Sequence, residues 1–277
     1  MTKKVMWLNR SLSGYSKLFE SNNSWMSISL ISTFNLETCN IKDHLEKVLT
    51  RKELKEFDYI PVCSKNKVVG ALNAEKFRQS TQIDGLVNSV MDKLSQSILI
   101  SANADILSFL KEADTSPYRL VLDGTEICGI VTISDLQQLP VRSVLFSLIT
   151  YLELLMAESI RQKYLNENDW IGKLTDGRRE KIEKKWNDPR CRKVAIDKLT
   201  VTEFCDKRVI IKQSQIIFNE NDGKIENILK DIQNLRDSLA HAGDYAATSD
   251  SAKSVAKIVR NTLGIISTLK KEIQTKE

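Results

Sequence analysis

Histidine and cysteine are scarce in this chain of 277 residues. There are two histidines, His44 and His241, and five cysteines, none of which forms a Cys-x-x-Cys pair. A zinc cluster of familiar spacing cannot be assembled from so few ligands, so we expect no metal site. An odd number of cysteines without a pairing pattern indicates free thiols in a reducing cytoplasm rather than a disulfide framework.

Long apolar runs are missing as well. The N-terminus, MTKKVMWLNR, carries two lysines but no apolar run long enough for a signal peptide. The stretch VLFSLITYLELLMA (144–157) is apolar, but it is too short to span a bilayer and contains Glu153, which predicts a buried helix. We therefore expect a cytoplasmic protein without a membrane partner.

The residues that are present describe a folded chain with room for two domains. Apolar residues make up 42% and charged residues 28% of the sequence. Residues 1–141 balance 16 Lys and Arg against 16 Asp and Glu, so the net charge of +5 comes from residues 142–277. The stretch RREKIEKKWNDPRCRK (178–193) favours a polyanionic partner such as RNA, although a solvated helix face explains it equally. The RNA-binding candidates are Arg178, Arg179, Lys184 and Lys185.

The first half contains a repeat. YIPVCSKNKVVGALNAEKF (59–77) and YRLVLDGTEICGIVTISDL (118–136) align without a gap at an offset of 59 residues, and each predicts a β-hairpin that runs into a helix. A β-type run and a helical segment precede each copy: SISLISTF (27–34) and IKDHLEKVLTRKELKEF (41–57), then SILISAN (97–103) and ADILSFLKEA (104–113). The unit is β-α-β-β-α, and the two copies are expected to share a core because neither can bury its sheet alone.

The second copy contains the string GIVTISD (129–135). Gly129 would let the backbone approach a ligand, Asp135 could accept two ribose hydroxyls, and Thr132 could donate to a phosphate. Thr-x-x-Asp is also a capping box, which alone explains both residues. The first copy has Asn73 and Lys76 at these positions, which keep a helix cap but remove the carboxylate. Ribose binding is therefore predicted for the second copy only.

Together these features resemble a tandem pair of CBS domains over residues 25–141. GIVTISD fits the family's Gly-x-x-Thr-x-x-Asp signature, whereas GALNAEK (70–76) departs from it at both polar positions. The resemblance implies a regulatory adenine nucleotide such as AMP, ADP or ATP in one cleft of the pair. It places Asp135 on the ribose and Thr132 on the phosphate, and Gly129 and Arg119 complete the candidate nucleotide-binding set.

Strand patterns fade after Val141. Helices are predicted at 141–165, 176–187, 190–211, 224–242 and 251–276, separated by spacers with Asn, Asp, Gly or Pro. Amphipathic helices with modest connections form a bundle. The predicted fold class is α+β, with a lead-in segment at 1–24, the repeat at 25–141 and an all-α bundle at 142–277.

One short string in this half, LRDSLAHAG (235–243), gathers three polar groups. At about 100° per residue, Arg236 falls within the apolar stripe of its helix, which is costly unless an anionic group meets it. Asp237 lies about 40° from His241 and can hydrogen-bond the imidazole and raise its pKa. Arg236 and His241 lie about 140° apart, so one phosphate can contact both only if the last turn unwinds or a second subunit completes the site.

The string resembles the Arg-x(4–6)-His motif of HEPN domains, with Asp237 where one common variant has Asn. Outside the motif the resemblance rests on helix layout. It implies a homodimeric, metal-independent endoribonuclease that needs no cofactor and leaves a 2′,3′-cyclic phosphate. Arg236 would clamp the phosphate, His241 would act as base or acid, and Asp237 would orient the imidazole. Both residues also have ordinary structural explanations. His241 could be a surface histidine that interacts favourably with the helix dipole, and Arg236 could be an arginine in a salt bridge.

The sequence thus suggests a nucleotide-regulated ribonuclease, by analogy a stress, toxin or defence effector. The alternative is a non-catalytic nucleotide-sensing scaffold whose helical domain only dimerises or binds a partner.

Overall fold

The computed structural model describes residues 26–80, 84–195, 197–217, 222–241 and 243–274. Its contacts divide the chain into two units, which we call the repeat unit and the helical unit. The repeat unit ends at Val141 and also includes Ala246–Ala256, whereas the helical unit comprises Arg142–Tyr245 and the chain from Lys257 onward. The lead-in segment predicted at 1–24 lies outside the described residues.

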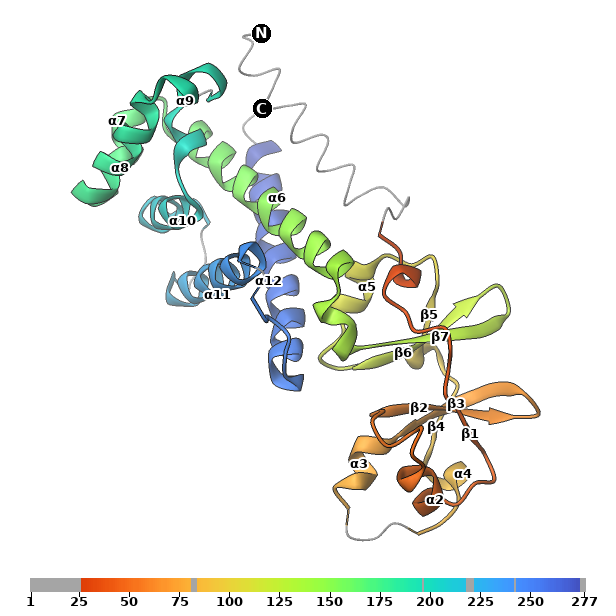
Figure 1. Ribbon diagram of the computed structural model, residues 1–277. Helices are drawn as coiled ribbons and strands as arrows, with labels where there is room; N and C mark the ends of the chain where they lie inside the picture. Colours follow the sequence, from red (N-terminus) through yellow and green to blue (C-terminus); the bar gives the residue numbers. More distant parts are fainter. Residues whose placement is uncertain (1–25, 81–83, 196, 218–221, 242, 275–277) are drawn as a thin grey trace. The chain divides into compact units, whose positions relative to one another are not determined.

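The two copies of the repeat fold alike (Figure 1). The first consists of β1 (Cys39–Asn40), α2 (Leu45–Thr50), β2 (Tyr59–Ser64), β3 (Lys67–Asn73) and α3 (Ala74–Arg78). The second consists of β5 (Leu99–Ser101), α5 (Ile106–Leu110), β6 (Tyr118–Asp123), β7 (Glu126–Thr132) and the 3-10 helix η3 (Ile133–Gln137). The predicted order of strands and helices is therefore confirmed in both copies, although the second copy ends in a 3-10 helix and the first begins at a different strand than expected.

The hairpins match residue for residue at the predicted offset. Tyr59 pairs with Asn73 in the first hairpin, and Tyr118 pairs with Thr132 in the second. Both hairpins shift register at the equivalent position of the first strand, and both first strands pair in parallel with the strand before the helix. The shared irregularity shows that the repeat extends to backbone detail.

The strand expected at 27–34 is not formed. This stretch contains the 3-10 helix η1 (Ile28–Leu30) and two isolated bridges, Ser27 to Asp105 and Thr33 to Ile130. Its backbone thus pairs with the second copy, not with the first sheet. The first sheet instead takes its parallel strand from Cys39–Asn40 and gains an antiparallel strand, β4 (Asp92–Lys93).

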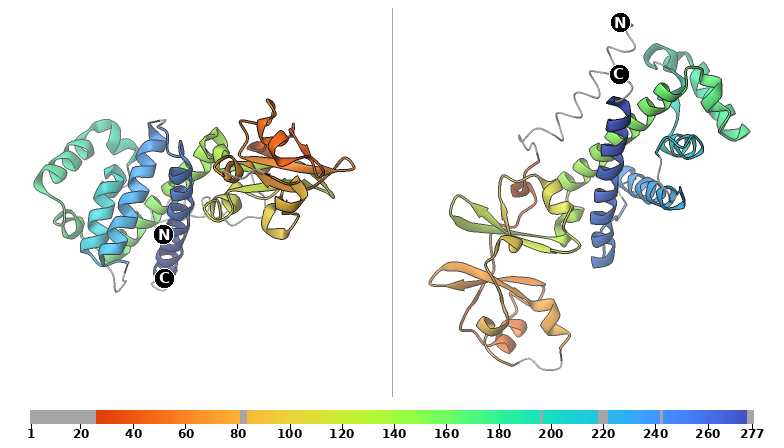
Figure 2. Two further views of the ribbon diagram at one scale, coloured as in Figure 1. Left: turned by 90° about the horizontal axis from the view of Figure 1, so that it is seen from below. Right: turned by 180° about the vertical axis from the view of Figure 1, so that it is seen from behind.

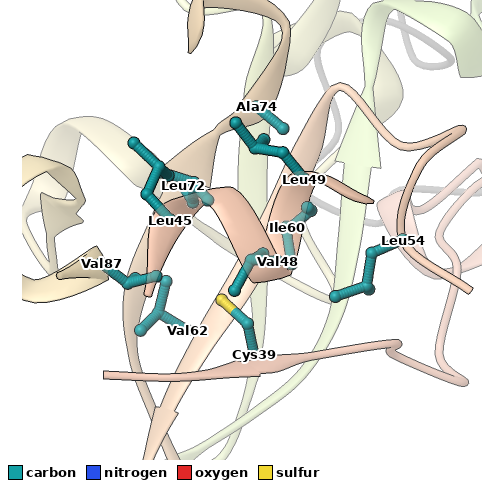
Figure 3. Packing of buried hydrophobic residues seen from close by; sticks show 10 residues of the cluster. All are labelled: Cys39, Leu45, Val48, Leu49, Leu54, Ile60, Val62, Leu72, Ala74 and Val87. Atoms are coloured by element: carbon teal, nitrogen blue, oxygen red, sulfur yellow. The ribbon is translucent and has the colours of Figure 1, made fainter. Parts of the chain in front are cut away.

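The first copy has a well-packed core on one face of its sheet (Figure 3). Helix α2 contributes Leu45, Val48 and Leu49, which pack against strand residues such as Ile60 and Leu72. The ten buried members are Cys39, Leu45, Val48, Leu49, Leu54, Ile60, Val62, Leu72, Ala74 and Val87. Truncation of one such leucine to alanine typically costs 2–5 kcal/mol.

The other face of the sheet meets the second copy. Buried Ala71 from β3 clusters with Tyr118, Leu120 and Ile130 of the second copy, and Tyr59 packs against this cluster. The two sheets therefore share a core, as predicted from the repeat.

The helical unit is built from long helices joined by shorter ones. Its long members are α6 (Leu139–Lys163), α8 (Asp176–Asn187), α10 (Phe204–Gln213), α11 (Asp222–Ala240) and α12 (Ser249–Gln274). The short members are α7 (Glu167–Ile171), α9 (Pro189–Val194) and the 3-10 helix η4 (Lys198–Val201). Helix α10 packs beside α11 (Figure 2). The predicted helical character of this half is confirmed.

The single helix predicted at 190–211 is wrong. The chain there forms α9, η4 and α10, because two side-chain caps interrupt it. The carboxylate of Asp197 accepts from the backbone N–H of Thr200, and Glu203 and Asp206 form a capping box that starts α10. An N-cap satisfies the free N–H groups of a new helix, so each cap begins a separate one.

Helix α6 is longer than the apolar stretch that predicted it. By length and composition alone it could cross a membrane, but 61% of its most apolar 18-residue window is buried inside the protein. Leu148, Leu152 and Met156 are among its buried residues. The predicted burial is confirmed, and the helix predicted at 141–165 is observed at Leu139–Lys163. The expectation that the apolar stretch is too short to span a bilayer does not hold for the whole helix.

Candidate ligand sites of the repeat unit and the motif helix

A cavity of 380 Å³ lies between the two copies of the repeat. We call it the Tyr118 cavity. The first copy contributes Tyr59 and Asn73, and the second copy and the segment before it contribute Asp92, Lys93, Ser95, Ser97, Ile98, Thr115, Ser116, Pro117, Tyr118 and Arg119. Its volume lies in the range of small-molecule sites, about 300–1,000 Å³.

Two stacked tyrosines form one wall of this cavity. The rings of Tyr59 and Tyr118 lie 4.5 Å apart, centre to centre, with an interplanar angle of 25°. The hydroxyl of Tyr118 donates to Asp92 at 2.8 Å. Burial, together with this hydrogen bond, raises the pKa of Tyr118 above its usual value. Burial also raises the pKa of Tyr59 to about 12, so both phenols remain neutral at physiological pH.

The cationic groups of the cavity differ in whether they already have an ion-pair partner. Arg119 is buried and donates to Glu112 at 2.7 Å and to the carbonyl of Tyr118 at 3.2 Å. Lys93 is exposed, and no ion-pair partner is found for it among the described residues. Lys93 is thus the cation that an incoming anion could engage without breaking an existing pair.

A second cavity, of 310 Å³, takes its lining from both copies and from the segment 246–252. We call it the Asp58 cavity. It is lined by Asp58, Tyr59, Glu75, Ile133, Ser134, Gln137, Ala246, Ala247, Thr248, Ser249 and Ala252. Two carboxylates and no Lys or Arg occur among these lining residues, so this cavity disfavours a phosphate. The side-chain carbonyl of Gln137 accepts from the backbone N–H groups of Ala246 and Ala247.

The predicted ribose anchor, Asp135, is engaged in helix capping. Its carboxylate accepts from the backbone N–H of Thr132 at 2.7 Å and from the side-chain amide of Gln138 at 2.7 Å. Burial raises the pKa of Asp135, against the effect of these hydrogen bonds. Neither Thr132 nor Asp135 lines either of the two cavities. Their roles toward a nucleotide remain predictions, and the capping box is observed.

Gly129 serves packing within the protein. A Cβ atom at this position would lie 3.0 Å from the carbonyl oxygen of Thr33 and 3.3 Å from the ring of Phe34. Gly129 was expected to let the backbone approach a ligand. Its close neighbour is instead the segment around Thr33, whose backbone forms a bridge with Ile130. Of the four predicted nucleotide-binding residues, Arg119 alone lines one of these two cavities.

The motif helix α11 ends as predicted, with His241 exposed in the turn that follows it. The anionic group that meets Arg236 is Glu153 of α6, whose Oε2 atom lies 3.7 Å from Nε of the arginine. Arg236 also pairs with Asp237 at 3.3 Å. The salt-bridged arginine of the alternative interpretation is therefore observed, and the sequence did not identify its partner.

A further residue that the sequence did not identify holds the end of this helix. Arg142 donates to the carbonyls of Leu239 and Gly243, each at 3.0 Å, and its guanidinium lies over the ring of Tyr245. It thus satisfies carbonyls that the end of a helix leaves free. One signal in the sequence indicated this contact, namely that a basic residue, Arg142, directly follows the end of the repeat at Val141.

The basic stretch 178–193 is largely paired within the protein. Arg178 donates to Asp206 at 2.6 Å, and this contact raises the pKa of the arginine above its usual range. Lys185 donates to Glu203, and Arg179 donates to the carbonyl of Leu174. Lys184 is exposed without an ion-pair partner among the described residues. RNA contact by this stretch remains a prediction. Lys184 is the one of its four candidates without an ion pair to a described residue.

The carboxylates of Glu203 and Asp206 and the thiol of Cys205 converge within 4.8 Å. Three cations, Arg178, Lys181 and Lys185, already contact the two carboxylates. Hydrogen bonds from these cations hold the pKa of Glu203 well below its usual range. We interpret this cluster as an ion-pair network that holds α8 against α10.

Comparison with known proteins gives only distant similarities. No family model matches the chain, and no curated protein matches it. Among solved structures, the CBS domain of a bacterial CNNM/CorC family Mg²⁺ transporter in complex with ATP is 19% identical, with a TM-score of 0.35 over 46% of this chain and 92% of that one.

Two further structures are similar to the same extent. A hemolysin-like CBS-domain protein of Oenococcus oeni is 14% identical (TM-score 0.35; 44% of this chain, 94% of that one). A CBS-domain protein of Thermoplasma acidophilum is 20% identical (TM-score 0.34; 44% and 75%).

Proposed function

We propose that the repeat unit is a nucleotide-sensing module that binds an adenine nucleotide in the Tyr118 cavity. The observation that carries the proposal is the composition of this cavity. It combines aromatic rings, several hydroxyl groups and a free cation, Lys93, between two copies of a repeat. The resemblance of residues 25–141 to a CBS pair implies the same class of ligand.

Different groups of the cavity suit the base, the ribose and the phosphate of a nucleotide. Ser95, Ser97 and Thr115 offer hydroxyls that can donate to or accept from a ribose or phosphate. Lys93 supplies the charge that a phosphate needs. The edge of the stacked tyrosines offers an apolar surface for the base. The Asp58 cavity lacks the cation, so we place the phosphate in the Tyr118 cavity.

Calorimetry with the full chain tests this proposal. AMP, ADP and ATP should bind, and adenosine should bind more weakly because it cannot engage Lys93. Lys93→Ala should weaken AMP binding by about tenfold, which corresponds to 1.4 kcal/mol. Lys76→Ala, an exposed lysine that lines neither cavity, is the matched control and should bind AMP as the wild type does.

The same titration separates the two placements of the nucleotide. If Asp135→Ala loses AMP binding and Lys93→Ala retains it, the nucleotide sits at the site predicted from the sequence and the Tyr118 cavity is the wrong location. If no adenine nucleotide binds the wild type, the sensing function itself is wrong.

RNA cleavage by the helical unit is a second candidate function. It is favoured by the exposure of His241 and by the length of the Arg236–Glu153 contact. At 3.7 Å this contact exceeds hydrogen-bond distance, and Arg236 donates through one nitrogen to Asp237 of its own helix, so its other N–H donors are available to a phosphate. His241 would act as base or acid toward the 2′-hydroxyl, and Arg236 would stabilise the charge on the phosphate. Dimerisation would bring a second copy of the motif to the substrate.

Incubation of total RNA with the purified protein in EDTA tests this candidate. Fragments that end in 2′,3′-cyclic phosphate should form, and His241→Ala should lower the rate by about 10²–10⁴-fold. Arg236→Ala should lose a comparable amount and Asp237→Asn less. Cleavage by the His241→Ala protein at the wild-type rate would leave the non-catalytic scaffold as the function of this unit.

A further inference from the structure

A third cavity, of 250 Å³, lies inside the helical unit between α6, η4 and α10. We call it the Lys207 cavity. The side chains that determine its chemistry are Glu153, Leu154, Ala157, Leu199, Thr202 and Lys207. None of them is part of the nucleotide cavity proposed above.

One wall of this cavity is a buried ion pair. The ammonium of Lys207 donates to Oε1 of Glu153 and to the carbonyl of Thr202, both at 2.9 Å. Its side chain is 6% exposed and that of Glu153 is 20% exposed. An ammonium has three N–H donors, so one remains after these two contacts with described residues. A buried donor without a partner is costly, and a ligand acceptor would relieve that cost.

The second carboxylate oxygen of Glu153 also forms no hydrogen bond with a described residue. Its Oε2 atom lies 3.7 Å from Nε of Arg236, which is beyond hydrogen-bond distance. The wall therefore presents an N–H donor from Lys207 beside a carboxylate acceptor from Glu153.

The charges around the cavity are balanced. Lys207 pairs with Glu153, and Arg161 pairs with Asp197 at 2.6 Å. A charged ligand would enter without a counter-charge, which is unfavourable in a buried site. The remaining lining is mostly apolar, with Leu154, Ala157 and Leu199. It also includes Thr150, Thr200 and Thr202, whose hydroxyls already donate to acceptors within the protein. A neutral molecule with apolar faces and one hydrogen-bonding edge is the ligand that this combination favours.

We propose that the Lys207 cavity binds a nucleobase with a lactam edge, such as uracil or guanine. The ring carbonyl accepts from Lys207, and the adjacent ring N–H donates to Glu153. The volume lies just below that of drug-sized sites, about 300–1,000 Å³, which suits a single base. Arg236 shares Glu153 with the cavity and is 32% exposed, so a sugar phosphate outside the cavity would lie near a cation. The inference does not depend on nucleotide binding by the repeat unit.

Methyl NMR of the full chain with neutral nucleosides as probes tests the proposed edge. Uridine or guanosine should shift the methyl resonances of Leu154 and Leu199 in a saturable manner. N3-methyluridine and N1-methylguanosine, which lack the ring N–H donor, should bind at least about tenfold more weakly, or 1.4 kcal/mol. Equal binding of the methylated nucleosides, or no saturable shift with any of them, overturns the proposal.

Two cavity-filling variants provide a crossed control. Ala157→Leu fills the Lys207 cavity and should abolish uridine and guanosine binding while AMP binding by the repeat unit is unchanged. Ser97→Leu fills the Tyr118 cavity and should do the reverse. Unchanged nucleoside affinity of Ala157→Leu contradicts the proposal. If that variant loses its helical circular dichroism, the wild-type comparison of methylated and unmethylated nucleosides decides alone.

Discussion

The two copies of the repeat share a backbone and differ in charge. At the offset of 59 residues, Tyr59 and Tyr118 are equivalent and stack on each other, but their neighbours differ. The first copy has Asp58 and Ile60 where the second has Pro117 and Arg119. These substitutions give the Asp58 cavity a carboxylate and the Tyr118 cavity a guanidinium. Lys93, from the segment between the copies, adds a second cation to the Tyr118 cavity.

The comparison teaches that a duplicated fold need not duplicate its ligand site. Strand register, the bulge and the helix start follow from the shared pattern of apolar residues and turns. The side chains at the strand ends face a cavity in both copies, so they can change without altering the sheet. Segment 246–252, which has no repeat equivalent, adds a further wall to the Asp58 cavity alone.

The largest expected difference between the copies concerns their glycines. A Cβ atom at Gly70 would lie 2.2 Å from the carbonyl oxygen of Asp92, whereas one at Gly129 would lie 3.0 Å from that of Thr33. Gly70→Ala should therefore destabilise the protein by about 3 kcal/mol and Gly129→Ala by about 1 kcal/mol. Urea unfolding followed by circular dichroism measures both. Equal costs would show that β4 can move away from β3 freely.

The helix starts provide the next contrast. Asp135 accepts from Thr132 and Gln138, whereas the side chain of Asn73 accepts from the backbone N–H of Lys76 and from no other described residue. Asp135→Ala should cost about 2 kcal/mol of stability and Asn73→Ala about 1 kcal/mol. Thermal unfolding of both variants measures the difference, with Lys76→Ala as a neutral control. An unchanged melting temperature for Asp135→Ala would show that the capping box contributes nothing, and would free Asp135 for a ligand role.

The hydroxyl groups of Tyr59 and Tyr118 should differ less in their contribution to stability than the two helix starts do. The hydroxyl of Tyr118 donates to Asp92, and no hydrogen bond of the Tyr59 hydroxyl is found among the described residues. Tyr118→Phe should therefore cost about 1 kcal/mol, and Tyr59→Phe should stay within about 0.5 kcal/mol of the wild type. Chemical denaturation of the two variants in parallel decides this. A larger loss for Tyr59→Phe would reverse the assignment of the two hydroxyls.

The smallest expected effect is a dependence on pH that only the second copy shows. Burial raises the pKa of Asp135 above its ordinary value of 3.8, so the folded protein binds this proton more tightly than the unfolded chain does. Stability should rise as pH falls through the folded-state pKa toward 3.8, and the gain should be absent in Asp135→Asn. Melting temperatures of the two proteins across this range test the sign. A wild type that loses stability relative to Asp135→Asn in this window would show a lowered pKa.

Local patterns predicted the repeat and most of the helices. The alternation of β-branched residues and the turn residues determine each hairpin within a stretch of about 15 residues, so no distant contact is needed to recognise them. The expected strand at 27–34 failed for the opposite reason. Its residues are apolar, but their backbone partners lie in the second copy, and apolarity does not identify a partner.

The candidate sites were predicted less well than the fold. Arg119 lines the Tyr118 cavity, and its role toward a nucleotide stays a prediction. Lys93 was missed because it lies between the copies and matches no motif. An anionic partner for Arg236 was expected from its position on the apolar stripe, but Glu153 could not be identified. The two residues are 83 positions apart and meet only when α6 packs against α11.

The sequence alone determined the duplicated β-α-β-β-α unit, the change to helices near residue 141 and the cap at Thr132 and Asp135, because these depend on contacts a few residues apart. Only the tertiary structure decided which cavity carries a free cation, which acid meets Arg236, and that Lys207 and Glu153 form the wall of a third cavity. Each of these depends on distant side chains brought together by packing, and the burial that sets their electrostatics exists only in the folded chain.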